Sequence, residues 1–368
     1  MTLPLVAMRS ADGRDELLVA AQHGATPPFP PILTGTIPDA LETPAGLHVT
    51  AFRSSALAAH ASRERRALEA IAWPAPLPRG VVLGRSCDAR GFLVEWPRAD
   101  RSRWIGLVSW DSGEVRWVAR GSSAFATLGP AGELAFSRRV SAPDASVPGE
   151  FALVVRASVE STAPERTLAL PGVSLVMPMF SADREHVYVL AVATNPGSRM
   201  RILVVDTRAE TLTIAREHTL GDAASIPAAF RAAVCTQTPW SARIQGPLAH
   251  GVAVFSGETN SMIWLDGSAG TPMPLAGETI SIAPLVNAGG QVPDGILLGT
   301  PKELLIQRDL SKTGFPPQFA APVTLLETGA IPRTVAAGTT VKLLLLVPPP
   351  SGESEEMGVY ELGSEDVR

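Results

Sequence analysis

Arginines gather in three short segments of this chain, where their chemistry suits the binding of anions. The segments are "PRADRSR" (97–103), "SRRVSAPDASVPGE" (137–150) and "TNPGSRMR" (194–201). A guanidinium group presents a planar fork of N–H donors that matches a carboxylate or a phosphate in a bidentate manner. The candidate partner-binding residues are therefore Arg98, Arg101, Arg103, Arg138, Arg139, Arg199 and Arg201.

A solvated surface whose charges pair within the chain is the competing interpretation of these arginines. Asp100 and Asp144 lie in the same segments and could neutralise them. Exposed ion pairs of this kind contribute little to stability and need no functional reason. Both interpretations stay open at this stage.

The linear signatures of catalysis and metal binding are absent from the sequence. It contains no nucleophile elbow, Walker loop, dinucleotide-binding glycine motif or helical pair of zinc-binding histidines. Its six histidines are dispersed, and Cys87 and Cys235 have no metal-ligand spacing. We therefore expect no cofactor and no metal. An enzyme is disfavoured but not excluded, because an active site assembled from single residues on different strands leaves no linear motif.

Four tryptophans, Trp96, Trp104, Trp110 and Trp117, crowd one part of the chain. Trp104 and Trp110 share one face of a strand by the two-residue period. Packing between sheets explains them best, and stacking on a sugar ring is the functional alternative.

Composition limits the class of protein further. The chain has 368 residues, 45% of them hydrophobic, and a net charge of −5, which gives no general attraction to nucleic acid or anionic membrane. No apolar run approaches the ~20 residues that span a bilayer, and the opening residues lack the pattern of a signal peptide. We expect no nucleic-acid partner and no membrane span. By default the protein is expected in the cytoplasm, or in the periplasm or outside the cell if a leader has been removed.

The elements that must position these residues are short strands in a repeated pattern. Apolar runs bounded by Gly, Pro, Asp and Ser recur, while long helical periodicity is scarce. One phrase places a tight turn before an apolar strand, as in "SADREHVYVLAV" (181–192), and it occurs in seven units. A second phrase ends a strand in an aspartate that is predicted to bond the amides of the following turn. Its aspartates are Asp111, Asp206, Asp266 and Asp309.

The two phrases alternate at roughly 50 residues per unit, the length of one four-stranded propeller blade. Together they resemble the repeats of WD-repeat-like, TolB-type β-propellers over about residues 78 to 347. The resemblance implies an all-β, single-domain β-propeller over 1–368, with seven four-stranded blades and six as the alternative. The family's usual proline after the turn serine is absent, since Ala11, Cys87 and Ala182 stand there.

The two ends of the chain carry additional features. Residues 22–46 form a Pro-rich insertion, and residues 55–73 are a candidate short helix because Ala, Arg, Glu and Leu favour helix. The C-terminal "MGVYELG" (357–363) is expected as the third strand of the last blade. A strand around residues 3–8 would then supply the fourth, closing the ring and hiding a sheet edge.

The propeller resemblance separates the charges onto two faces. The loops that join the second and third strands of each blade lie on one face, and all seven candidate arginines fall in one sector of it. The hairpin turns lie on the opposite face and carry acidic residues: Asp12, Asp15, Asp88, Asp111, Glu114, Glu133, Asp183, Glu185, Asp206 and Asp266.

We therefore expect a non-catalytic protein–protein interaction or scaffold module that binds a protein partner, one with an acidic surface, through the loop face. The alternative is a glycan-acting hydrolase or lyase with a site at the central channel. The oligomeric state stays open.

Overall fold

The computed structural model divides the chain into two compact units. One comprises residues 1–5, 21–47 and 73–244, and the other comprises residues 6–20, 48–72 and 245–368. The residues described are 5–11, 14–22, 47–53, 70–71, 81–97, 102–121, 123–129, 131–140, 150–160, 162–180, 184–193, 201–219, 242–248, 251–256, 261–265, 272–274, 279, 281–286, 293–308, 310, 319–326, 329, 331–337, 340–347 and 358–362.

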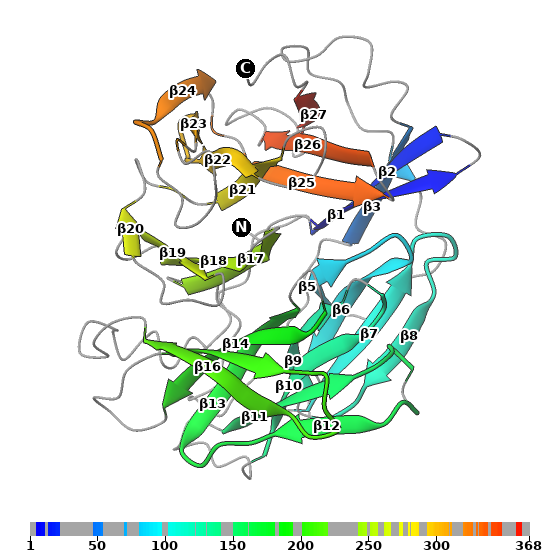
Figure 1. The fold of residues 1–368 in the computed structure, drawn as a ribbon. Coiled ribbons are helices and arrows are strands. Elements are labelled where there is room, and N and C mark those ends of the chain that lie inside the picture. Colours follow the sequence, from blue (N-terminus) through cyan, green and yellow to red (C-terminus); the bar gives the residue numbers. More distant parts are fainter. Residues whose placement is uncertain are drawn as a thin grey trace. The chain divides into compact units, whose positions relative to one another are not determined.

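All regular elements among the described residues are strands, and they form antiparallel sheets in chain order (Figure 1). Three four-stranded sheets lie in the first unit. Sheet 2 contains β5 (Val82–Cys87), β6 (Gly91–Pro97), β7 (Arg103–Ser109) and β8 (Val115–Ala119). Sheet 3 contains β9 (Ser123–Leu128), β10 (Leu134–Arg139), β11 (Phe151–Arg156) and β12 (Glu165–Leu168). Sheet 4 contains β13 (Val173–Phe180), β14 (His186–Ala193), β15 (Arg201–Asp206) and β16 (Thr213–Thr219).

The other four sheets lie almost wholly in the second unit. Sheet 1 contains β1 (Leu5–Ala11), β2 (Arg14–Gln22), β3 (Leu47–Arg53) and β4 (Ala70–Ile71). Sheet 5 contains β17 (Ala242–Leu248), β18 (Gly251–Ser256), β19 (Ser261–Leu265) and β20 (Pro272–Pro274). Sheet 6 contains β21 (Ser281–Val286), β22 (Pro293–Gly299), β23 (Leu304–Arg308) and β24 (Val323–Leu326). Sheet 7 has three described strands, β25 (Ile331–Ala337), β26 (Thr340–Val347) and β27 (Gly358–Leu362).

Each repeated phrase of the sequence occupies the same place in every sheet that contains it. Each of the seven turns of the first phrase joins the first and second strands of a sheet, and the turns of the second phrase join the third and fourth strands. This confirms an all-β fold of antiparallel, mostly four-stranded meanders. The closed ring of seven blades and the single domain stay predictions.

Two turn aspartates bond backbone amides, and one of them, Asp206, is among the four for which this was predicted. Asp88 Oδ1 accepts hydrogen bonds from the backbone N–H of Arg90 at 2.8 Å and of Gly91 at 3.2 Å. Asp206 Oδ1 accepts one from the N–H of Arg208 at 2.8 Å. In the turn after β7, Ser109 Oγ accepts the N–H groups of residues 111 and 112 at 3.2 and 3.3 Å. Asp266 and Asp309 lie outside the described residues.

The core of the first unit lies between its sheets, because some of its strands are buried along their whole length. The residues of β9 and β11 are all buried. One apolar cluster joins sheets 2 and 3, with Leu93, Ile105 and Phe136 among its members. A second joins sheets 3 and 4 and includes Ala135, Leu153 and Val189. The first strand of each later sheet packs against the sheet before it, β9 on β5 and β7, and β13 on β9, β10 and β11.

A bulge interrupts the first strand of both sheet 3 and sheet 4. Phe125 and Met177 have φ of 56°, and the register to the second strand shifts beside each of them. A non-glycine residue with positive φ is strained, so surrounding contacts must hold it in place. At Phe125 the N–H donates to Glu95 Oε1 of sheet 2 at 2.8 Å.

The ends of the chain differ in part from expectation. The predicted third strand of the last sheet is confirmed as β27. The strand predicted to complete that sheet, β1, instead lies at the edge of sheet 1 beside β2. Residues 70–71 of the predicted helix form β4, paired with β3, because sheet pairing can override a helix propensity. Residues 55–69 and 23–46 lie outside the described part of the chain.

Candidate functional site

The two ends of sheets 2 to 4 carry different connections, and they are named here accordingly. The loop end carries the connections from second to third strand, near residues 98–102, 140–150 and 194–200. The turn end carries the connections from first to second and from third to fourth strand. Of the predicted arginines, the loop end of the described residues holds Arg103, Arg138, Arg139 and Arg201, while Arg98, Arg101 and Arg199 lie outside them.

Arg103 turns into the protein instead of toward a partner. Its side chain is 11% exposed, and its Nη1 lies 3.8 Å from Glu95 Oε2, whose side chain is 2% exposed. The same carboxylate accepts the N–H of Phe125, so it joins sheet 2 to the bulge of sheet 3. A buried charge is tolerated when it is paired in this way, which makes Arg103 part of the scaffold.

Arg138 starts at the loop end but runs back along sheet 3. Its Nη2 donates to Glu165 Oε1 at 2.9 Å, although Glu165 pairs in register with Arg156 at the opposite end of β11. The guanidinium passes over the ring of Phe136, 5.1 Å from its centroid. This arginine is therefore withdrawn from the loop end.

Arg156 completes a network around the same carboxylate. Its side chain is 5% exposed, donates to Glu165 Oε1 from Nε at 3.0 Å, and also donates to the carbonyl of Val118 in sheet 2. Hydrogen bonds from two arginines lower the pKa of Glu165 to about 2, against the opposing effect of burial. The bond from Arg138 is the largest cause, and the bond from Arg156 lowers the pKa further. Glu165 therefore stays ionised and holds the two arginines.

Arg201 makes an exposed pair within sheet 4. Its Nη1 donates to Glu217 Oε2 at 3.1 Å, with side chains 29% and 43% exposed. A pair this open to solvent is worth little, and a competing anion could replace it.

Arg139 differs from the other described arginines of the loop end in having no ion pair with a described carboxylate. Its Nε is buried and has no hydrogen-bond partner, as is also true of Arg103 Nη1. The same holds for the buried Oγ of Ser137, two positions earlier on β10. The sequence singled out Arg139 but gave no reason to add Ser137.

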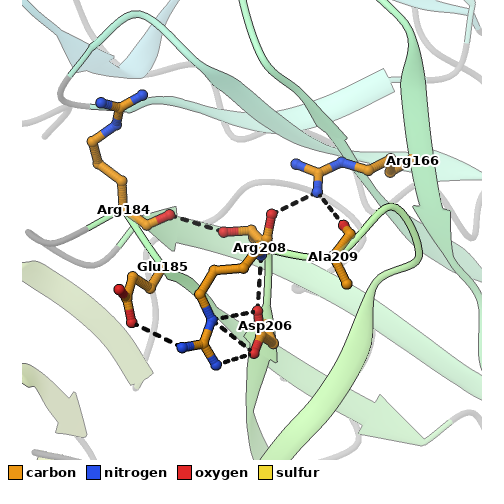
Figure 2. Close-up of polar contacts among 7 residues, drawn as sticks. Arg166, Arg184, Glu185, Asp206, Arg208 and Ala209 are labelled. Atoms are coloured by element: carbon orange, nitrogen blue, oxygen red, sulfur yellow. Dashed lines mark hydrogen bonds and ion pairs between the residues drawn. The ribbon is translucent and has the colours of Figure 1, made fainter.

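The turn end is a network of paired charges, part of which Figure 2 shows. Asp206 accepts hydrogen bonds from the Nε of Arg208 at 3.1 and 3.2 Å, and Arg208 also reaches Glu185 at 3.3 Å. The hydrogen bonds from the side chain and then the backbone of Arg208 lower the pKa of Asp206 to about 2. Arg166 of sheet 3 donates to the carbonyls of Thr207 and Ala209 at 2.6 and 2.7 Å, which clamps a turn of sheet 4.

Contacts between neighbouring turns continue along the turn end. Arg184 of sheet 4 pairs with Glu133 of sheet 3. The guanidinium of Arg90 in sheet 2 lies against Gly132 of sheet 3, where φ is +93° and a Cβ would collide with it. Four residues of the predicted acidic face are thus paired with arginines that sequence reasoning left out: Asp88, Glu133, Glu185 and Asp206. Two of these arginines could have been found from the sequence, because Arg90 and Arg208 each follow a turn aspartate by two positions.

The tryptophans pack on one another within sheet 2. The rings of Trp96 and Trp117 stack with centroids 5.2 Å apart, and Trp104 meets both edge-on at 5.9 and 5.6 Å. The Arg120 guanidinium lies 4.8 Å from the Trp104 ring. Trp110 is separate, since its Nε1 donates to the Asp88 carbonyl at 2.7 Å. Stacking on a sugar ring stays a prediction.

The described ranges contain no group of three or more His, Cys, Asp or Glu residues arranged to hold a metal ion. Nor is any helix in those ranges of the length and apolarity that a bilayer crossing requires.

At the level of the fold, the chain resembles β-propellers, TolB-type proteins among them. The periplasmic gluconolactonase of Pseudomonas aeruginosa is 14% identical, with a TM-score of 0.47, over 94% of this chain and 88% of that one. The β-propeller domain of the Trilobed protease from Pyrococcus furiosus is 12% identical, with a TM-score of 0.43, over 77% and 81%.

A putative TolB from Agrobacterium tumefaciens is 10% identical, with a TM-score of 0.34, over 55% of this chain and 62% of that one. No family model and no curated protein matches the sequence. At these identities and TM-scores the likenesses carry no argument about activity.

Proposed function

We propose that the chain is a seven-bladed β-propeller that acts as a non-catalytic interaction module. It binds a protein partner with an acidic surface through the loop end of its sheets. The observation that carries this proposal is Arg139 at that end, whose Nε is buried and has no hydrogen-bond partner. The sequence places Arg98, Arg101 and Arg199 in the neighbouring connections, and we propose that they join it.

The turn-end carboxylates support a structural role over a catalytic one at that end. Asp88, Glu133 and Asp206 each accept hydrogen bonds from backbone amides or from arginine side chains. The hydrogen bonds from Arg208 lower the pKa of Asp206 to about 2, so this carboxylate stays ionised and is poorly placed to act as a general acid. The glycan-acting alternative would need other carboxylates, at the central channel.

The test uses a fluorescently labelled hexaglutamate peptide, with a hexaglutamine peptide as its uncharged control, titrated into the full chain by fluorescence anisotropy. We expect the wild-type chain to prefer hexaglutamate and to lose that preference as salt is raised. Equal affinity for the two peptides would overturn the proposal.

Charge reversal locates the binding surface. Arg101→Glu, Arg139→Glu and Arg199→Glu are combined, while Arg103 is left intact because a glutamate there would be buried beside Glu95. The matched control reverses Arg116, Arg216 and Arg308, which changes the net charge equally. We expect the first variant to lose hexaglutamate binding and the control to retain it. Equal losses in both would show only an effect of net charge and contradict the assigned surface.

A further inference from the structure

Two buried hydrogen-bonding groups without partners lie side by side on β10. Ser137 and Arg139 are two positions apart, so their side chains leave the same face of sheet 3. Ala135, on that face, belongs to the apolar cluster shared with sheet 4. Ser137 is 0% exposed, and its Oγ and the Nε of Arg139 lack hydrogen-bond partners. Both groups therefore face sheet 4 near the loop end.

Buried polar groups in native proteins nearly always have a partner, so an orphaned pair calls for a reason. The contrast within the loop end is direct: Arg138 has Glu165 and Arg201 has Glu217. Arg139 as a residue is partly exposed although its Nε is buried, so its side chain extends from the sheet toward solvent. An anion from outside could therefore meet the guanidinium.

One carboxylate of the chain itself lies nearby and must be considered as a competitor. Glu150 closes the connection after β10, where its carbonyl accepts the N–H of Val140 at 2.9 Å. Its carboxylate is engaged elsewhere, since Oε1 accepts the N–H of Gly172 at the start of sheet 4 at 3.1 Å. Glu150 is thus committed to fastening the two sheets.

We propose that Ser137 and Arg139 together bind a single carboxylate of the protein partner, an inference that rests on the proposed function. The guanidinium fork receives the two carboxylate oxygens, and the serine hydroxyl donates to one of them. One positive charge matches one carboxylate. A phosphate group, with its charge near −2, would need a second arginine, and Arg138 is already held by Glu165.

The test measures hexaglutamate affinity of single variants by fluorescence anisotropy. We expect Arg139→Gln to weaken binding about 10-fold or more, because the charged fork is lost. Ser137→Ala removes only the neutral donor and is expected to weaken it by a few-fold. Arg139→Lys keeps the charge without the fork and falls between wild type and Arg139→Gln. Arg216→Gln, an exposed arginine of β16, is the matched control and leaves binding unchanged.

The outcomes separate this inference from the proposed function. Failure of the wild-type chain to prefer hexaglutamate over hexaglutamine would remove both. Strong wild-type binding, lost in the triple reversal but unaffected by Arg139→Gln, would overturn only the assignment of this site.

A structural role for Arg139 has its own signature. If Arg139 pairs with Glu150 in solution, then Arg139→Gln and Glu150→Gln destabilise the protein equally and non-additively in urea unfolding, which would overturn the inference. We expect instead that Glu150→Gln leaves hexaglutamate affinity unchanged or raises it. Urea midpoints of every variant confirm that altered binding does not reflect unfolding.

Discussion

The turn end and the loop end of sheets 2 to 4 use arginine in different ways. At the turn end, Arg184 and Arg166 reach from one sheet to the next and bond a carboxylate or turn carbonyls. At the loop end, Arg103 and Arg138 are also held by carboxylates, whereas Arg139 is left without one among the described residues. A cluster of arginines in the sequence therefore does not by itself mark a binding surface, because most of these arginines form ion pairs or hydrogen bonds within the fold.

The largest loss of stability is expected when Arg103, the arginine of the loop end that turns inward, loses its ion-pair partner. Glu95→Ala removes the ion partner of Arg103 and the acceptor of the Phe125 N–H, both buried. Breaking a buried pair from one side typically costs about 3–5 kcal/mol of unfolding free energy, measured in urea. Glu95→Gln keeps an acceptor for the amide and should lose less. A loss of unfolding free energy below about 0.5 kcal/mol for Glu95→Ala would show that Glu95 does not stabilise Arg103.

The second largest loss of stability is expected when Arg138, the arginine that runs back from the loop end, loses its carboxylate partner. Glu165→Gln removes the charge that holds Arg138 and Arg156, and solvent screening limits the expected loss to about 1–2 kcal/mol at pH 7. Urea unfolding measures it. Arg116→Gln, which removes one partner of an exposed pair, is the control and should change stability far less.

The pH dependence of the difference in unfolding free energy between wild type and Glu165→Gln gives an independent check of the ion pairs of Glu165. The pKa of Glu165 is lowered from 4.5 to about 2 in the folded state, so its contribution is complete above pH 4.5 and is lost as the pH falls toward 2. The difference in unfolding free energy between wild type and Glu165→Gln should therefore shrink steadily over this interval. A difference that persists unchanged at pH 2 would contradict the ion pair.

A smaller effect is expected at the turn end. Asp206→Asn keeps the shape of the turn but weakens the charged bonds to Arg208, so the melting temperature should fall slightly. The pKa of Asp206 is also about 2, so the fall should disappear in acid below that value and shrink at high salt. A salt-independent loss would instead identify backbone strain in the turn as the cause.

The smallest effect on stability is expected at Arg139. Arg139→Met removes a guanidinium whose Nε has no partner, so the unfolding free energy should stay within about 0.5 kcal/mol of wild type or rise. The same urea experiment measures it beside Arg138→Met, which loses its bond to Glu165. If Arg139→Met and Arg138→Met lower the unfolding free energy equally, Arg139 contributes as much to stability as Arg138, which contradicts the comparison.

Much of the fold could be predicted because its signals are local. Strand alternation and turn residues such as Asp88 and Asp206 act within a few positions, so each predicted turn falls between the expected strands. The final strand, β27, was likewise legible from its apolar residues. The end of the predicted helix at residues 70–71 was not, because its pairing partner on β3 lies about 20 residues away in the chain.

The candidate site was predictable only in part, since a long side chain goes wherever its partner is. Glu165 lies 27 residues from Arg138, and no local pattern links them. The structure describes four of the arginines, Arg103, Arg138, Arg139 and Arg201, at strand ends beside the predicted loop segments, and only the three-dimensional contacts show that Arg103 is buried. Ser137 carried no sequence signal at all, because an unsatisfied hydroxyl is a property of its surroundings.

The bulge at Phe125 ties the assembly of one sheet to the presence of another. Its positive φ is held by Glu95, a residue of the preceding sheet, so β9 has a defined alignment only once sheet 2 is in place. The first unit should therefore melt as one cooperative block and not sheet by sheet. A sheet 3 cut from this array, or moved to another position in it, would lose the carboxylate that holds its own strand register.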